Sequence, residues 1–262
     1  MAFDKNNIPI DTDERIDTIP GTDFSLIQKI DGTAFSIDTL LLADFVDFPT
    51  NLLNIADLGS GSGILAFLMK YRNEKSAVTG FEIQKEFYEL ACRNIQMNPQ
   101  FSSVYFENTD VRDIPSRVLP ESFDLVVSNP PYFPANSGRI PEKPGRAIAR
   151  HELNGKLKDF VEAAAYMLPY GGRFCVVIPS IRFYEIDKYL KAADFGIKRL
   201  RFVIPKEGEK SHLVLIEADK FYSGKHESMP DITIHHADGS YGEELKEIFS
   251  VGLKRVKRFS NA

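Results

Sequence analysis

The sequence has little of what marks a secreted or membrane protein. Its two cysteines, Cys92 and Cys175, sit in apolar runs, so no disulfide framework is readable and a reducing compartment is expected. The first residues lack the basic-then-apolar pattern of a signal peptide, and no apolar run approaches the ~20 residues of a membrane span. Tryptophan is absent, which leaves aromatic packing to 20 Phe and 10 Tyr. These absences predict a cytoplasmic protein without a membrane partner.

The sequence also lacks an excess of positive charge. With 32 basic and 37 acidic residues, its formal net charge is −5 at pH 7. A protein with this balance does not hold a polyanion by bulk attraction. A nucleic-acid partner would therefore have to be bound by a local basic patch.

From residue 54 onward, strand-like and helix-like segments alternate. This alternation is typical of the α/β class, with a parallel sheet covered by helices on both faces, and 262 residues suit one large domain of this kind. Strands are expected at residues 55–58, 78–81, 104–106, 123–128, 174–178, 198–204 and 212–217, and helices at 39–48, 64–71, 85–97, 157–168 and 182–193.

The two ends of the chain differ from this middle part. Residues 1–23 are polar and acidic, as expected of a loose arm or lid, and residues 24–32 suggest a small hairpin. Near the C-terminus, apolar residues at helical spacing predict an amphipathic helix. We divide the chain into an arm and hairpin at residues 1–32, a main domain at 33–220 and an extension at 221–262.

A glycine-rich loop follows the first strand of the main domain. Asp57 lies near the end of that strand, and Gly59, Gly61 and Gly63 precede a helix. Glycines leave room for a ligand, and helix N-termini suit a carboxylate or phosphate. Dinucleotide enzymes share such loops, but their glycine spacing is wider, and Asp57 would repel a pyrophosphate. Asp57 can instead accept hydrogen bonds from an ammonium group, which favours S-adenosylmethionine over NAD; a tightly packed turn without a ligand is the other alternative.

Acidic residues follow the next two strands. Glu82 lies 19 residues beyond Gly63 at a strand end, where a carboxylate can bind both hydroxyls of a ribose. Asp110, after the third strand, can accept from the exocyclic amine of a cofactor adenine; a solvated loop aspartate is the alternative. The expected cofactor site therefore comprises Asp57, Gly59, Gly61, Gly63, Glu82, Ile83, Asp110 and Val111, together with Asn129.

The fourth strand ends in Asn129-Pro130-Pro131-Tyr132, at the sheet edge where doubly wound proteins bind ligands. The prolines fix the backbone, so that the Asn129 side chain and the Pro130 carbonyl present two adjacent oxygen acceptors. These acceptors match the two N–H bonds of one planar amino group, and Tyr132 offers a flat face for stacking. A proline-rich turn without chemistry is the alternative.

Methylation of a planar nitrogen requires this kind of arrangement. The lone pair of such a nitrogen is delocalised, which makes it a poor nucleophile. Two acceptors stabilise the positive charge that develops as the nitrogen attacks a sulfonium methyl group, and the loop aligns the reacting atoms. The proton that leaves afterwards needs no general base. We therefore expect catalytic roles for Asn129, Pro130 and Tyr132.

Four features, taken in order, resemble the motifs of the Rossmann-like amino-methyltransferases. They are the segment from Asp57 to Gly63, then Glu82, then Asp110, and finally the segment from Asn129 to Tyr132. The resemblance covers residues 33–218. It implies a class I methyltransferase fold, which is a seven-stranded, mostly parallel sheet with helices on both faces and the last strand antiparallel. The Asn-Pro-Pro-Tyr signature is shared by enzymes that methylate adenine in DNA or RNA, guanine in RNA, or glutamine in proteins.

A narrower resemblance comes from two further segments. The segment from Phe35 to Phe45 and the segment from Arg146 to Glu152 look like those of the bacterial tRNA adenine methyltransferases that act beside the valine anticodon. Chains of that family have about this length and no large separate RNA-binding domain. The resemblance implies tRNA as the substrate, with the exocyclic amine of adenine 37 of valine tRNA as the target.

A basic stretch next to the Asn-Pro-Pro-Tyr segment suits RNA. Residues 139–158 hold six basic and two acidic residues, and Arg139, Lys143, Arg146 and Arg150 are the candidate RNA contacts; a solvated loop without a partner is the alternative. A protein glutamine amide, as on a translation release factor, and a non-enzymatic scaffold that binds the cofactor remain competing functions. We expect no metal site and no obligate protein partner.

Overall fold

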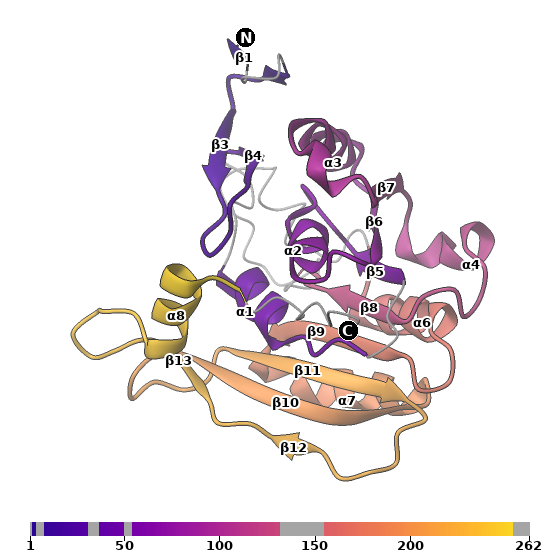
Figure 1. Cartoon of the computed structure of the whole chain (residues 1–262). Helices are drawn as coiled ribbons and strands as arrows, with labels where there is room; N and C mark the ends of the chain where they lie inside the picture. Colours follow the sequence, from indigo (N-terminus) through magenta and orange to yellow (C-terminus); the bar gives the residue numbers. More distant parts are fainter. Residues whose placement is uncertain (1, 4–7, 31–36, 50–53, 132–154, 254–262) are drawn as a thin grey trace, which may run out of the picture.

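The computed structural model describes residues 2–3, 8–30, 37–49, 54–131 and 155–253. Its centre is a nine-stranded sheet in the order β12-β10-β11-β9-β8-β5-β6-β7, in which β13 also pairs with β10 (Figure 1). The strands are β5 (Asn54–Leu58), β6 (Ala77–Glu82), β7 (Val104–Asn108), β8 (Leu125–Ser128), β9 (Arg173–Pro179), β10 (Phe195–Lys206), β11 (Leu213–Lys220), β12 (Glu227–Ser228) and β13 (Ile232–His235).

Strands β7, β6, β5, β8 and β9 run parallel, and β11 lies antiparallel between β9 and β10. This confirms the expected mostly parallel sheet with an antiparallel last strand. The short strands β12 and β13 extend it along β10 beyond the seven strands expected. Every residue of β8 is buried, because both faces of a parallel sheet are covered by helices.

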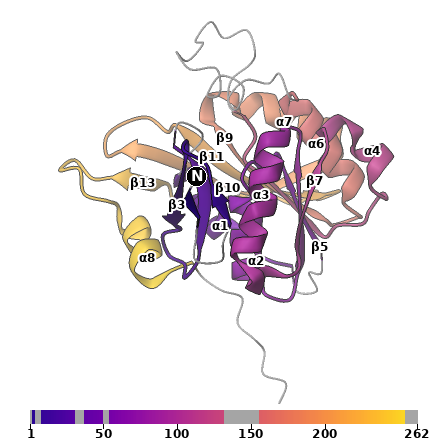
Figure 2. The ribbon, with the colours of Figure 1, turned by 90° about the horizontal axis from the view of Figure 1, so that it is seen from above.

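Helices cover the sheet in two layers. Figure 2 shows α2 and α3 on one face and α4, α6 and α7 on the other. Apolar side chains of α1, α2 and α3 fill one core, and those of α4, α6 and α7 fill the second. The helices are α1 (Ile37–Phe45), α2 (Ile64–Arg72), α3 (Lys85–Met97), α4 (Ile114–Arg117), α6 (Leu157–Met167), α7 (Phe183–Ala192) and α8 (Glu243–Val251), with short 3₁₀ turns η1 (Pro99–Phe101), η2 (Val111–Asp113) and η4 (Ser180–Arg182).

The structure differs from the expected loose arm at residues 1–23. Strand β3 (Glu14–Thr18) pairs antiparallel with β4 (Ser25–Lys29), and two further short strands, β1 (Ala2–Phe3) and β2 (Pro9–Ile10), pair with each other. The fully buried Glu14 carboxylate binds Arg93 of α3 at 2.8 and 2.5 Å. Burial raises the pKa of Glu14, but the hydrogen bonds from Arg93, the Asp11 N–H and Lys29 together outweigh it and bring the pKa down to about 2. An ion pair to a distant helix therefore anchors this acidic segment.

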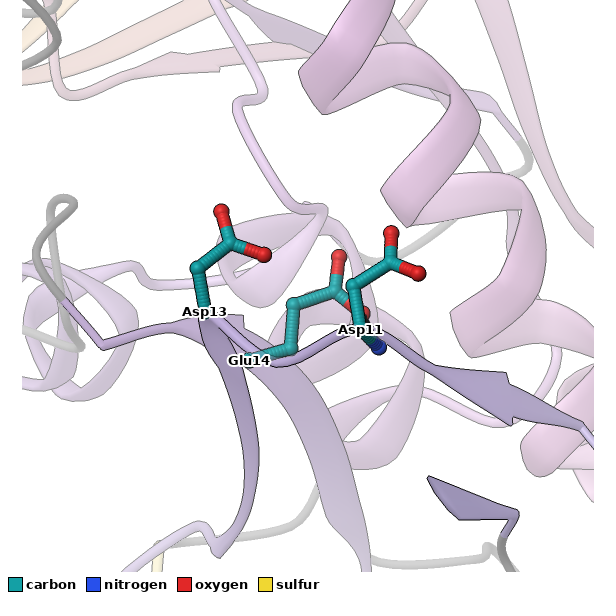
Figure 3. A group of neighbouring side chains, drawn as sticks. All are labelled: Asp11, Asp13 and Glu14. Carbon is teal, nitrogen blue, oxygen red and sulfur yellow. Dashed lines mark hydrogen bonds between the residues drawn. The ribbon is translucent and has the colours of Figure 1, made fainter. Parts of the chain in front are cut away.

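Figure 3 shows Asp11, Asp13 and Glu14 close together near the start of β3. Lys29 lies 3.0 Å from Asp13 and 3.1 Å from Glu14, and Arg93 binds Glu14 from α3. Lys29 and Arg93 thus offset part of the negative charge of this cluster, and the pair of Arg93 with Glu14 contributes to the docking of the hairpin on α3.

Three arginines hold the C-terminal end of α1, whose own last turn has no basic residue. Arg72, Arg173 and Arg199 donate hydrogen bonds to backbone carbonyls between residues 43 and 47. The buried Glu217 carboxylate lies 3.2 Å from Arg173 and 2.5 Å from Arg199, and Asp219 lies 2.9 Å from Arg173, so that two carboxylates pair with these two arginines. Cations at a helix C-terminus stabilise it through the helix dipole. The position of α1 against the sheet is therefore fixed by residues from three other elements.

Helix α8 packs its buried Leu245 and Ile248 into the core that contains α1. Beyond it, the backbone N–H of Leu253 donates to the Gly21 carbonyl in the turn between β3 and β4. The β3–β4 hairpin and α8 thus contact each other and share the core that contains α1. Within the described ranges, every helix is too short or too polar to span a lipid bilayer.

Candidate active site

The glycine loop connects β5 to α2 and is closely packed at Gly59 and Gly63 but open at Gly61. Gly59, Gly61 and Gly63 have φ values of +73°, +56° and +92°, in the left-handed region that favours glycine. A Cβ at Gly63 would lie 2.4 Å from the Phe106 ring, whereas one at Gly61 would meet nothing within 4 Å. The loop is therefore packed against the protein at Gly63 and open at Gly61.

Asn94 of α3 supports the closed side of this loop. Its buried side chain donates to the carbonyls of Ser62 at 3.1 Å and Ile27 at 3.0 Å, and accepts from the Ile27 N–H at 2.7 Å. One amide thus joins the loop, α3 and the N-terminal hairpin. Nothing in the local sequence around Asn94 indicates this bridge, because both partners are distant in the chain.

Two buried polar atoms at the loop have no protein partner. Asp57 Oδ2 and Ser60 Oγ make no hydrogen bond within the described part of the chain. The pKa of the Asp57 carboxyl is raised to about 8, because burial and, to a smaller extent, the nearby Glu82 outweigh the hydrogen bond from the Ala66 N–H. Because unsatisfied buried polar atoms are unfavourable, a ligand with hydrogen-bond donors suits this position.

Glu82 ends β6 and contacts the open glycine directly. Its Oε2 accepts from the Gly61 N–H at 2.8 Å and its Oε1 from the Gln84 N–H at 2.8 Å. Burial raises the pKa of Glu82 despite these bonds. The next residue, Ile83, is half-buried, and its carbonyl accepts from Asn108 at 2.9 Å. A carboxylate oxygen can accept more than one hydrogen bond, so Glu82 can also bind hydroxyl groups of a ligand.

Asp110 and Val111 follow β7 at the same edge of the sheet. Asp110 accepts from the Arg112 backbone N–H at 2.9 Å and from the Arg112 side chain at 2.9 and 3.0 Å, and these bonds lower the pKa of Asp110. Val111 is buried. The amine of a cofactor adenine would therefore have to share the Asp110 carboxylate with the Arg112 side chain or displace that side chain. The contact between Asp110 and the adenine stays a prediction.

Asn129 follows β8 beside the start of the glycine loop. Ser128 pairs with Leu58 in parallel register, and its hydroxyl donates to the Leu58 carbonyl at 2.7 Å. The half-buried Asn129 side chain donates from Nδ2 to Thr39 Oγ1 of α1 at 2.9 Å. This bond turns Oδ1, the acceptor atom of the amide, away from Thr39, and Pro130 next to it is buried.

Sequence reasoning missed Thr39, which it assigned only to an expected helix. Thr39 and Asn129 lie 90 residues apart, so no local pattern connects them. Tyr132, Arg139, Lys143, Arg146 and Arg150 lie outside the described residues. The stacking face at Tyr132 and the RNA contacts of the basic stretch therefore stay predictions.

The structure brings Asp57, Gly61, Glu82 and Asn129 to one edge of the sheet, at the carboxyl ends of three neighbouring strands. The first three combine carboxylates with an open glycine, which suits a ligand carrying an ammonium group and a ribose. Asn129 adds an oriented amide next to it. This edge can hold a cationic nucleoside ligand against a planar nitrogen.

Comparison with known proteins agrees with this arrangement. The family model of the methyltransferase small domain matches residues 31–196. A protein of Aeromonas hydrophila named tRNA1(Val) (adenine(37)-N6)-methyltransferase is 28% identical over 204 residues, covering 77% of this chain and 82% of its own. A protein of Haemophilus influenzae with the same name is 29% identical and covers 86% of this chain and 93% of its own.

Solved structures share the fold. A predicted O-methyltransferase from Agrobacterium tumefaciens superposes with a TM-score of 0.67 at 21% identity, covering 84% of this chain and 98% of that one. An S-adenosylmethionine-dependent O-methyltransferase from Thermotoga maritima has a TM-score of 0.51 at 17% identity, covering 74% and 69%. At these identities the likeness concerns the fold alone.

Proposed function

The chain belongs to the methyltransferase small domain family, and from this premise we infer that it transfers a methyl group from S-adenosylmethionine to the exocyclic nitrogen of adenine 37 in valine tRNA. The observation that carries the proposal is the Asn129 amide, which Thr39 orients beside the glycine loop. The relatives named for this activity match across most of their length, which supports the choice of substrate.

The residues of the loop fit S-adenosylmethionine. Asp57 Oδ2 and Ser60 Oγ are buried acceptors suited to the ammonium group of its amino-acid part, and Glu82 is suited to its ribose hydroxyls. Gly61 leaves the space that the ligand requires. When bound, the cofactor supplies an electrophilic methyl group on a sulfonium sulfur.

Asn129 acts on the nitrogen that receives the methyl group. Its Oδ1 and the Pro130 carbonyl accept the two N–H hydrogens of the amine, and both acceptors stabilise the positive charge that grows on nitrogen. Thr39 holds the amide in the rotamer that presents Oδ1. The extra proton becomes acidic once the nitrogen is alkylated and leaves to water, so no general base is required.

A glutamine side chain offers a similar planar nitrogen, so Asn129 by itself is compatible with a protein substrate. Two observations favour RNA. The relatives are named for tRNA, and the sequence stretch 139–158 carries six basic residues against two acidic ones. In this proposal the chain modifies tRNA in the cytoplasm without a second protein.

Methyl-labelled S-adenosylmethionine tests the proposal. The purified chain is incubated with a valine tRNA transcript, with the same transcript carrying guanine at position 37, and separately with a translation release factor. We expect label in N6-methyladenosine from the first transcript alone. Equal labelling of both transcripts would overturn the assignment of adenine 37, and label in a release-factor glutamine would establish the protein substrate instead.

A further inference from the structure

Two large apolar side chains stand out from the surface on a single turn. Ile181 is 89% exposed and Tyr184 is 84% exposed, the highest values among the large hydrophobic residues that the structure describes. Ile181 lies in η4, and Tyr184 lies in the first turn of α7. Residues three apart in helical turns lie on the same side. Single exposed apolar residues are ordinary, whereas these two side chains form one small apolar surface on a single turn.

Hydrogen bonds fix this turn to its surroundings. Ser180 donates from its backbone N–H to the His212 carbonyl at 2.9 Å and from its hydroxyl to the Ser211 carbonyl at 2.6 Å. Arg182 binds both carboxylate oxygens of Glu185, at 2.8 and 2.9 Å. A surface that is ordered in advance loses little conformational freedom when it binds.

The turn lies at the edge of the sheet that carries Asn129. Strand β9 runs parallel to β8, with Val176 opposite Ser128, and it continues to Pro179 before η4 begins. Val177 of β9 therefore stands level with Asn129, and η4 begins three residues later at Ser180. Three residues of a strand span roughly 10 Å along its direction. This distance suits a nucleotide next to the one that Asn129 binds.

We propose that Tyr184 and Ile181 form a stacking platform for a nucleobase adjacent to the target adenine. This inference rests on the proposed function. A target base must leave its stack to reach Asn129, which exposes a face of its neighbour. Tyr184 covers that face, and Ile181 adds apolar contact beside it.

The size of the platform favours a base over a protein partner. A stable protein interface buries about 800 Å² on each side, far more than two side chains provide. One base, in contrast, stacks on one aromatic ring, and this contact is tolerant of sequence. Recognition of RNA relies largely on unstacked bases that pack on aromatic side chains.

Tyr184→Ala tests the platform, with Tyr170→Ala as its matched control. Tyr170 is 79% exposed and stacks on Phe221 at 5.4 Å, but it precedes β9 and so lies at the opposite edge of the sheet. We expect Tyr184→Ala to raise the KM for the valine tRNA transcript roughly 5- to 150-fold, the range measured for loss of one base–aromatic stack. Tyr184→Phe keeps the ring and should retain the wild-type KM. The affinity for S-adenosylmethionine and the melting temperature should not change in either Tyr184 variant.

A fluorescent base gives a direct reading of the same contact. 2-Aminopurine placed next to position 37 of the transcript should be quenched when the wild-type protein binds, but not when Tyr184→Ala binds. Equal KM and equal quenching in both proteins would overturn the platform while leaving the proposed function intact. A wild-type protein that methylates no tRNA would overturn both. A Tyr184→Ala variant impaired only on a release factor would assign this surface to a protein substrate.

Discussion

Gly61→Ala should weaken the binding of the cofactor and lower the stability of the fold only modestly. The φ of Gly61 is +56°, where an alanine is disfavoured by about 1–2 kcal/mol. A Cβ at this position meets nothing within 4 Å, so no clash adds to that value. In a domain of this size, such a loss lowers the melting temperature by about 2–8 °C.

The affinity for S-adenosylmethionine should fall as well. A methyl group on Gly61 would enter the open space beside the loop, on the side where we propose that the cofactor lies and Glu82 binds its ribose. A ligand held there has to shift. Because an extra methyl group in a closely packed site costs about 1–3 kcal/mol, and 1.4 kcal/mol is tenfold in affinity, we expect the Kd for S-adenosylmethionine to rise about tenfold.

Calorimetric titration with S-adenosylmethionine and thermal melting measure the two effects separately. Gly208→Ala is the matched control, because Gly208 has a φ of +84°, also meets nothing within 4 Å, and lies between β10 and β11. It should lose similar stability and keep the wild-type Kd. If Gly61→Ala also bound the cofactor with the wild-type Kd, the loop would not form the wall of the cofactor site.

Three further predictions concern the substrate and the proton. Thr39→Val should lower kcat about 3- to 10-fold, because it removes one neutral hydrogen bond to Asn129, and Thr39→Ser, which keeps the hydroxyl, should retain the wild-type kcat. If Thr39→Val and the wild-type protein had equal kcat at saturating tRNA, Thr39 would have no role in the mechanism. Burial raises the pKa of Asp57 from 3.8 to about 8, so binding of an ammonium ligand at pH 7 should release a proton from this carboxyl. The free protein should also lose stability as the pH rises from 3.8 to about 8, because Asp57 ionises first in the unfolded chain. Titration in buffers of different ionisation enthalpy detects this proton, which Asp57→Asn should abolish. Arg146→Glu or Arg150→Glu should raise the KM for tRNA without changing cofactor affinity, and unchanged tRNA kinetics would place the RNA surface elsewhere.

Much of the main domain could be predicted because its signals are local. A helix was expected at residues 85–97, and α3 spans Lys85–Met97. The buried strands stand out as short apolar runs between turn residues, and the glycine loop and Glu82 lie at strand ends because they follow such runs directly. Periodicity and strand order suffice to bring these residues to one edge.

What could not be predicted depends on partners distant in the chain. Strand β3 reads Glu-Arg-Ile-Asp-Thr, which suggests a solvated arm until Arg93 of α3 is seen to bind Glu14. Asn94 and Thr39 look like ordinary helix residues, yet one joins the hairpin to the loop and the other orients Asn129. Side-chain bonds of this kind leave no periodic signal in a single sequence.

The rate of a single turnover by Asn129→Ala, at saturating S-adenosylmethionine and tRNA, bears on the central claim most directly. Truncation removes the side-chain acceptor and leaves the glycine loop in place. We expect transfer to slow by at least about 100-fold, as for the loss of one preorganised hydrogen bond to a developing charge. A rate within about threefold of the wild-type rate, a difference of less than 1 kcal/mol, would contradict this account of how the amine is activated.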